Sequence, residues 1–240
     1  MVSDIQAGWY PDPAGPPGLR WWDGTGWTSN LSSVAGAPAP ANVEEEATRG
    51  RRARVALLVA IPAQLVCLVI FRQQFRTLTD QAGDLDRDGR LARPPFSGGL
   101  SGATMQLAGA VGLVAGVLFL LWFSRSAANA QALGLPARRE PAAGVAGFVI
   151  PVINLWWPYQ STCDLLPQGD ARRSLVLRWF LLWMVGGFAG AIFSWVSIFV
   201  DGPTGWLVLA LPAALTTLAA LSARRVVSEV VAAHAALAPR

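Results

Sequence analysis

Lysine is absent from this 240-residue chain, histidine occurs once, and cysteine occurs twice. The lone His234 excludes a histidine-rich metal site and argues against a catalytic pairing of serine with histidine. We expect it to be an ordinary residue on a helix surface. Cys67 falls in an apolar run and Cys163 in a polar connection, so neither a disulfide nor a Cys-x-x-Cys site is expected.

Charge is also scarce: 14% of the residues are charged and 53% are hydrophobic. This balance is typical of a small polytopic membrane protein, so the lipid bilayer is the first partner to expect. The net charge is only +4. The arginines cluster beside hydrophobic segments rather than among aromatic residues on a polar surface, which argues against nucleic-acid binding.

Four uncharged runs are long enough to cross a bilayer as helices. The shortest has about 17 residues, which spans roughly 25 Å at 1.5 Å per residue. The runs are residues 55–71, 105–123, 179–200 and 206–221. The predicted fold is mainly α, a polytopic helical membrane bundle.

A fifth apolar segment, residues 142–157, is ambiguous because it is short and contains Pro151 and Asn154. If it crosses, the usual excess of arginine on the inner side is reversed. If it is instead a broken re-entrant or interfacial element, twelve flanking arginines lie inside and five outside, as the positive-inside rule requires. We therefore predict four transmembrane helices plus this element, in a multi-pass protein of the cell membrane with both termini cytoplasmic. No signal peptide is expected, because residues 1–30 lack a hydrophobic segment.

The predicted spans contain no charged side chain, whereas transporters of ions or protons normally place charged groups at depth. No combination of nucleophile and base, or of metal ligands, suggests an enzyme or a cofactor. Small-residue faces occur at Gly112–Gly116 and Gly186–Gly190, and they favour close helix packing. Packing within one monomer is the favoured interpretation, and a homo-oligomer interface stays open.

Residues 1–33 read as a separate module, because four tryptophans and four prolines crowd into residues 8–28. The turn-forming Asp23–Gly26 stretch lies between two aromatic-rich strands and predicts a small β-hairpin. So few residues cannot form a real core. We expect Trp9, Trp22 and Trp27 to pack on neighbouring prolines instead.

The other aromatic and basic residues of the module, Tyr10, Arg20 and Trp21, are expected to be more exposed. A small aromatic surface of this kind suits docking of an extended or Pro-rich peptide of a cytoplasmic protein. The alternative is that the tryptophans only hold the module together.

The module is followed by residues 34–54, which we interpret as a disordered linker with three glutamates and a terminal basic cluster. The membrane domain is placed at residues 55–222. Residues 223–240 follow as a cytoplasmic amphipathic helix, with Val227, Val230 and Val231 at helical spacing.

An acidic stretch at residues 84–89 matches the opening of an EF-hand calcium loop, with Asp84, Asp86 and Asp88 at alternate positions. The twelfth position, which requires an acidic residue, is Pro95. A solvated turn is therefore favoured over a calcium site.

Two family resemblances accompany these features. The motif GWYPDP, followed by RWWDG and WT, resembles a short Trp-rich domain of unknown function numbered 2510. The segment from Arg125 through Asn129 to Gly134, followed by Pro151, Asn154 and a Pro-Tyr pair at 158–159, resembles the multi-span domain of unknown function numbered 4328. This second resemblance covers roughly residues 55–222. Neither family brings an established activity.

The broken element also suggests a site. Asn154 stands between two prolines, where it can satisfy backbone groups that lipid leaves unpaired, with Asn129 or Gln160 as expected partners. A packed structural wedge is the favoured interpretation. A small-ligand or lipid-headgroup site lined by Arg125, Asn129, Asn154 and Tyr159 is the alternative.

The sequence thus predicts a non-enzymatic membrane protein whose Trp-rich module docks or senses a partner. The alternative is a small permease, or a protein that binds lipid or another small ligand, using residues 151–159.

Overall fold

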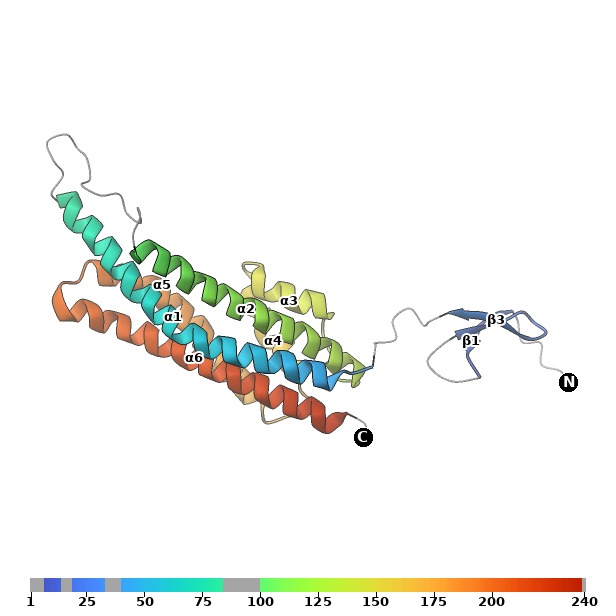
Figure 1. Cartoon of the computed structure of the whole chain (residues 1–240). Coiled ribbons are helices and arrows are strands. Elements are labelled where there is room, and N and C mark those ends of the chain that lie inside the picture. The colour runs from blue at the N-terminus through green and yellow to red at the C-terminus, as the bar shows by residue number, and fades with distance from the viewer. Residues whose placement is uncertain (1–6, 14–18, 33–39, 84–99, 239–240) are drawn as a thin grey trace. The chain divides into compact units, whose positions relative to one another are not determined.

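The computed structural model describes residues 7–13, 19–32, 40–83 and 100–238. The chain divides into two compact units, Met1–Pro40 and Ala41–Arg240. The first contains a small β-sheet and the second a helical bundle (Figure 1).

The first unit is a three-stranded antiparallel sheet in the order β1-β2-β3, formed by β1 (Gly8–Pro11), β2 (Leu19–Trp22) and β3 (Trp27–Ser32). Strands β2 and β3 form the predicted hairpin, and β1 adds a strand to it. The Asp23 carboxylate shapes the turn by accepting hydrogen bonds from Thr25 and from the backbone N–H of Gly26, at 2.7 to 2.8 Å. Gly24 has a φ of 97°, which favours glycine there.

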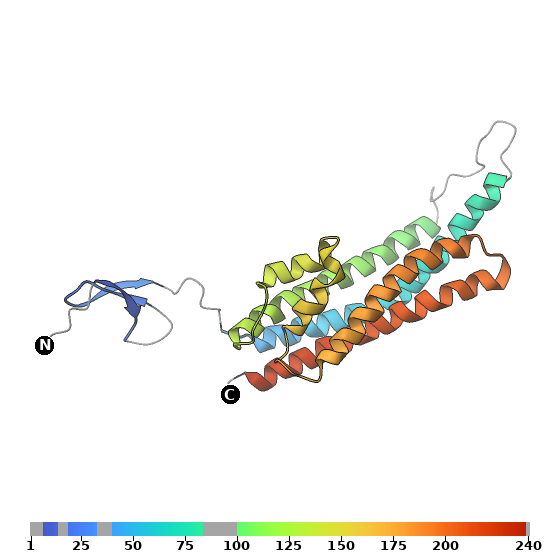
Figure 2. The ribbon, with the colours of Figure 1, turned by 180° about the vertical axis from the view of Figure 1, so that it is seen from behind.

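Four long helices lie side by side in the second unit (Figures 1 and 2). They are α1 (Val43–Gly83), α2 (Leu100–Ala132), α5 (Arg173–Ile198) and α6 (Gly202–Leu237). Within the described part of the chain, these four helices are long and apolar enough to cross a membrane. This confirms the predicted set of four spans.

The ambiguous segment forms three short pieces: α3 (Pro141–Val149), a 3₁₀ turn (Ile153–Leu155) and α4 (Trp157–Cys163). Even α3, with nine residues, reaches only about 14 Å, less than half of a roughly 30 Å hydrocarbon core. The chain breaks at Pro151 and Val152, and Val152 has a φ of 71°, which is rare for a β-branched residue. The predicted broken element is therefore confirmed.

The prediction of a disordered linker at 34–54 was wrong for its second half, because α1 already begins at Val43. The Asn42 side chain caps the helix by accepting a hydrogen bond from the Glu45 N–H at 2.9 Å. The three glutamates occupy the first turn, where the helix dipole favours negative charge. Residues 34–39 lie outside the described part.

The predicted C-terminal helix is present, but it continues α6 without a break rather than forming a separate segment. Val227 and Val230 are fully buried, so this end of α6 belongs to the bundle.

The main core lies where α1 begins, α6 ends, and the short helices α3 and α4 pack (Figure 2). Its largest buried side chains include Trp122, Phe123, Leu165, Leu166 and Val227.

At the opposite end of the bundle, two arginines of α1 bind the carbonyl groups at the end of α5. Arg72 is 3% exposed and donates to the Val200 carbonyl at 3.1 Å. Arg76 donates to the same carbonyl at 3.0 Å and pairs with Asp201. Cations suit this position because carbonyl groups and negative partial charge are exposed at a helix C-terminus. These contacts give Arg72 and Arg76 a structural role at the end of the bundle where the predicted orientation expects few arginines.

Candidate functional sites

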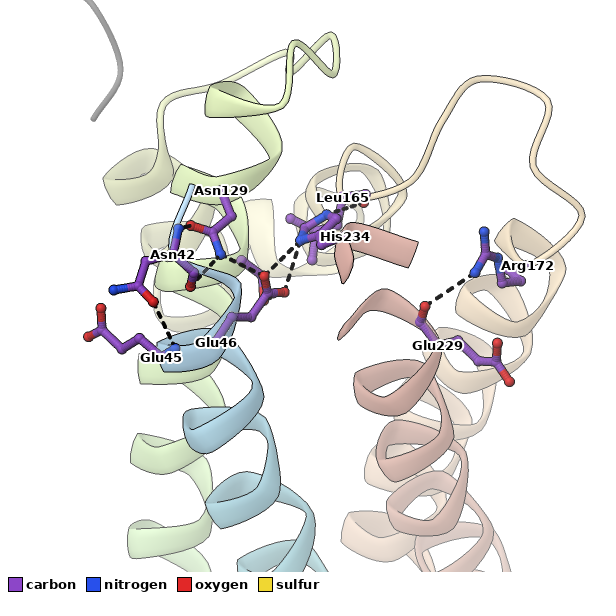
Figure 3. A network of polar contacts seen from close by, with 9 residues as sticks. Asn42, Glu45, Glu46, Asn129, Leu165, Arg172, Glu229 and His234 are labelled. Atoms are coloured by element: carbon purple, nitrogen blue, oxygen red, sulfur yellow. Dashed lines mark hydrogen bonds and ion pairs between the residues drawn. The ribbon is translucent and has the colours of Figure 1, made fainter. Parts of the chain in front are cut away.

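Four polar side chains from three helices meet in the core at the start of α1. They are Glu46 of α1, Ser126 and Asn129 of α2, and His234 of α6, and none is more than 2% exposed. Figure 3 labels Glu46, Asn129 and His234. We call this group the polar clamp.

The Glu46 carboxylate is fully hydrogen-bonded. Ser126 donates to its Oε1 and Asn129 donates to its Oε2, both at 2.7 Å. His234 Nδ1 lies 2.9 Å from both oxygens (Figure 3). On the other side of the ring, Nε2 lies 2.8 Å from the Leu165 carbonyl oxygen.

The hydrogen-bond geometry fixes how many protons Glu46 and His234 hold together. A carbonyl only accepts, so His234 Nε2 must carry a hydrogen and donate to Leu165. One further proton is required between Nδ1 and Glu46, whether it resides on the ring or on the carboxyl. In both arrangements the pair is neutral overall, which explains how both groups can be buried without an uncompensated charge.

The polar clamp joins segments far apart in sequence. Through Glu46 it ties α1 to α2 and α6, and through Leu165 it ties α6 to the connection after α4. Asn129 extends the contact by exchanging hydrogen bonds with the backbone of Asn42 at 3.0 Å. No cluster of metal-ligating residues occurs within the described residues. The arrangement is suited to holding the helix ends together.

The expectation that His234 lies on a helix surface was wrong, as was the placing of Glu46 in a linker. A periodic signal was present, because His234 follows the buried Val227 and Val230 by seven and four residues. Glu46 gives no such signal. It is one of three consecutive glutamates, and nothing in the sequence distinguishes it from Glu44, which is exposed.

The structure does not bring together the predicted site of Arg125, Asn129, Asn154 and Tyr159. Asn129 belongs to the polar clamp, and Arg125 pairs with Glu45 at 3.1 Å. Asn154 donates to the Phe148 carbonyl at 3.0 Å, so it does satisfy the broken helix as expected. Its expected partners were wrong: Asn129 binds Glu46, and Gln160 accepts from Arg139 at 2.6 Å. Tyr159 packs against the ring of Phe180.

Cys163 does not lie in an open polar connection, because it is only 4% exposed. Burial raises the pKa of its thiol, which lowers the thiolate fraction that reacts with maleimides. Native Cys163 is therefore a poor reporter of which side of the membrane this segment faces.

The small-residue faces behave differently on the two helices. On α5, a side chain at Gly186 would meet Leu215 of α6 at 3.3 Å, so this glycine allows close packing within the monomer, as expected. On α2, nothing lies within 4 Å of a side chain added at Gly112 or Gly116. Both glycines instead line a cavity of about 550 Å³ between the four long helices. Packing within the monomer was thus the wrong expectation for α2.

In the module, the predicted division into packed and more exposed residues was wrong for Trp27 and for Tyr10, Arg20 and Trp21. Trp22 packs edge-on against Trp27, with ring centroids 5.2 Å apart, but Trp27 itself is 42% exposed. Tyr10, Arg20 and Trp21 are half-buried, and Arg20 pairs with Asp12 at 2.9 Å. The Trp9 side chain and the acidic stretch at residues 84–89, for which a solvated turn was favoured over a calcium site, lie outside the described residues.

The four apolar helices and the N-terminal sheet define a polytopic helical membrane protein with a small β module. The chain belongs to the family described as Domain of unknown function (DUF4328), whose model matches residues 86–238. Residues 7–41 match a second model, Protein of unknown function (DUF2510). No curated protein and no solved structure matches the chain.

Both matches confirm the two family resemblances, but the matched residues differ from the ranges expected from the sequence. The match to the membrane family begins at residue 86, so it leaves out all of α1. Helix α1 nevertheless supplies Glu46 to the polar clamp. The folded bundle is therefore larger than the segment that the family model matches.

Proposed function

We propose that this protein is a non-enzymatic membrane adaptor, in which the bundle anchors the Trp-rich module and the module docks a cytoplasmic protein or peptide. The observation that carries the proposal is the exposed Trp27, which stands beside Tyr10 and Trp22 on a unit that is compact by itself. An aromatic cluster with one exposed tryptophan, in which Tyr10 pairs with Arg20 across β1 and β2, suits an extended or Pro-rich peptide. Tyr10, Arg20 and Trp21 are the proposed contact residues.

The proposed orientation places the start of α1 and the end of α6 in the cytoplasm. Contacts between Glu46 and His234 put these two ends on one side of the bundle. The twelve arginines expected inside flank this end, which agrees with the positive-inside rule.

Cysteine accessibility in cells tests this orientation. In a background without Cys67 and Cys163, we expect the exposed Gln168→Cys to react with a membrane-impermeant maleimide only after permeabilisation. Thr204→Cys, exposed at the other end of the bundle, should react in intact cells. The opposite pattern would place the module outside the cytoplasm and end the proposal.

Deletion of residues 1–33 tests the docking role. If the module recruits a partner, the deletion and Trp21→Ala should both abolish the cellular phenotype, whereas Asn154→Ala should leave it intact. Membrane levels of each variant must match the wild type, because a loss of folding would imitate a loss of docking. A phenotype that survives deletion would refute the adaptor function.

A second candidate is a protein that binds or moves a small apolar molecule. The cavity between the long helices favours it, because Phe148 of the broken element contributes to the lining beside Trp179 and Trp183. Gly112→Leu should fill part of this space without a backbone clash. Under this alternative Gly112→Leu abolishes the phenotype, and under the adaptor function it does not.

A further inference from the structure

A second hollow lies on the outer surface of the bundle, between α1 and α2. Its α1 side is formed by Arg51, Arg52, Val55, Ala56 and Val59, and its α2 side by Leu107, Ala110, Val111, Val114 and Leu118. We call it the α1–α2 groove. Its volume is about 680 Å³. Apart from the two arginines at one end, every lining residue is apolar.

The apolar part of the groove faces outward from the bundle. Val55, Val59, Leu107 and Val114 are all more than half exposed. Helix α1 and helix α2 are both long enough to cross the bilayer, so this outward face is in contact with lipid chains.

The length of the groove matches one leaflet. From Leu107 to Leu118 the α2 wall extends about 16 Å, and half of a hydrocarbon core of roughly 30 Å is about 15 Å. Arg49 donates to the Leu121 carbonyl at 3.2 Å, and this contact sets Arg52 level with Leu118. The two arginines therefore stand at the membrane surface when an acyl chain occupies the groove.

The charge at this end is uncompensated. Glu45 pairs with Arg49 and with Arg125, and Arg54 donates to Ser228. Within the described part of the chain, no ion pair or hydrogen bond engages Arg51 or Arg52, and both are exposed. Two adjacent guanidinium groups suit a phosphate group, which they can bind through charge-assisted hydrogen bonds.

We propose that the α1–α2 groove binds one anionic phospholipid of the leaflet at the arginine-rich end, with its phosphate at Arg51 and Arg52 and an acyl chain along the groove. Selective binding of this lipid requires both the two arginines and the apolar groove. Charge alone would attract anionic lipid diffusely, and the groove alone would accept the chain of any lipid. The site is independent of the docking role of the module.

The test is a titration of the purified full-length protein with phosphatidylglycerol and with phosphatidylcholine of the same acyl chains, followed by native mass spectrometry. We expect the wild type to bind one phosphatidylglycerol in preference to phosphatidylcholine. Replacing both Arg51 and Arg52 by glutamine should weaken this binding roughly tenfold or more, on the scale of two arginines near an anionic surface. The matched control is Arg178→Gln with Arg225→Gln, which removes two exposed arginines from the same end of the bundle.

A second pair of variants tests the groove without changing the charge of the protein. Ala110→Phe places a ring in the apolar part and should also weaken phosphatidylglycerol binding, whereas Ala210→Phe, on the exposed surface of α6, should not. If the Arg51/Arg52 variant and the Arg178/Arg225 variant lose phosphatidylglycerol binding equally, the attraction is diffuse and the proposal is overturned. A wild-type dimer that Ala110→Phe converts to a monomer would also overturn it, because a second copy would then occupy the groove.

Discussion

Replacing His234 by leucine is expected to lower the free energy of unfolding by about 3–5 kcal/mol, the scale found when one partner of a buried pair is removed. The variant leaves Glu46 buried with a carboxylate that only Ser126 and Asn129 still contact. It also leaves the Leu165 carbonyl without its donor. Reversible denaturation of the full-length protein in mixed detergent micelles measures the effect.

Two further experiments distinguish the loss of the polar clamp from a nonspecific effect of mutation on stability. Glu44→Gln changes an exposed carboxylate two residues from Glu46 and should be nearly neutral. A double-mutant cycle of Glu46→Gln and His234→Leu should show a coupling of about 1–3 kcal/mol. Additive effects would mean that the two side chains do not interact in the folded protein.

Gly205→Ala is expected to destabilise the opposite end of the bundle by about 3 kcal/mol, the upper range for overpacking. An added Cβ would overlap with Arg72 Nη2 and with the Val200 carbonyl oxygen. The guanidinium group must then leave the carbonyl that it binds, and α6 must shift away from the end of α5. The same denaturation experiment measures the loss.

The control for Gly205 is Gly109→Ala on α2, where nothing lies within 4 Å of the added carbon. It should be neutral or slightly stabilising, since alanine favours helix over glycine. Adding Arg72→Ala to Gly205→Ala removes the arginine clash but not the carbonyl clash, so the double variant should stay destabilised. A Gly205→Ala protein as stable as the Gly109→Ala protein would contradict the contact between Arg72 and α6.

The sequence predicted the long apolar helices and the broken element because each depends on a local property. Uncharged length predicts a span, and Pro151 beside Asn154 predicts a break. The Asp23–Gly26 turn was equally local. These features need no knowledge of which segments meet.

The polar clamp was missed because its members are ordinary in sequence and become unusual only in contact. Glu46 resembles a solvated residue of an acidic run until α6 brings His234 within 2.9 Å. Asn129 was identified, but with the wrong partner, because its distance from Asn42 and Glu46 in the chain is over eighty residues. The cavity beside Gly112 was missed for a related reason, since a small-residue pattern does not show whether a neighbour fills the space.

The extent of the family match bears on any experiment that isolates a domain. A fragment limited to residues 86–238 would lack α1 and would leave His234 without Glu46. It would also lose the α1 side of both hollows. Variants should therefore be studied in the full chain.

The adaptor function is tested most directly by photocrosslinking in living cells. A photoreactive residue at Ser29, exposed two positions after Trp27, should give a discrete crosslinked product, and the same residue at Thr204 should give none of that product. Trp21→Ala and Trp27→Ala should each abolish the product at Ser29 at unchanged protein levels. No product at Ser29, or one that both alanine variants leave unchanged, would contradict the claim that the Trp-rich module docks a partner.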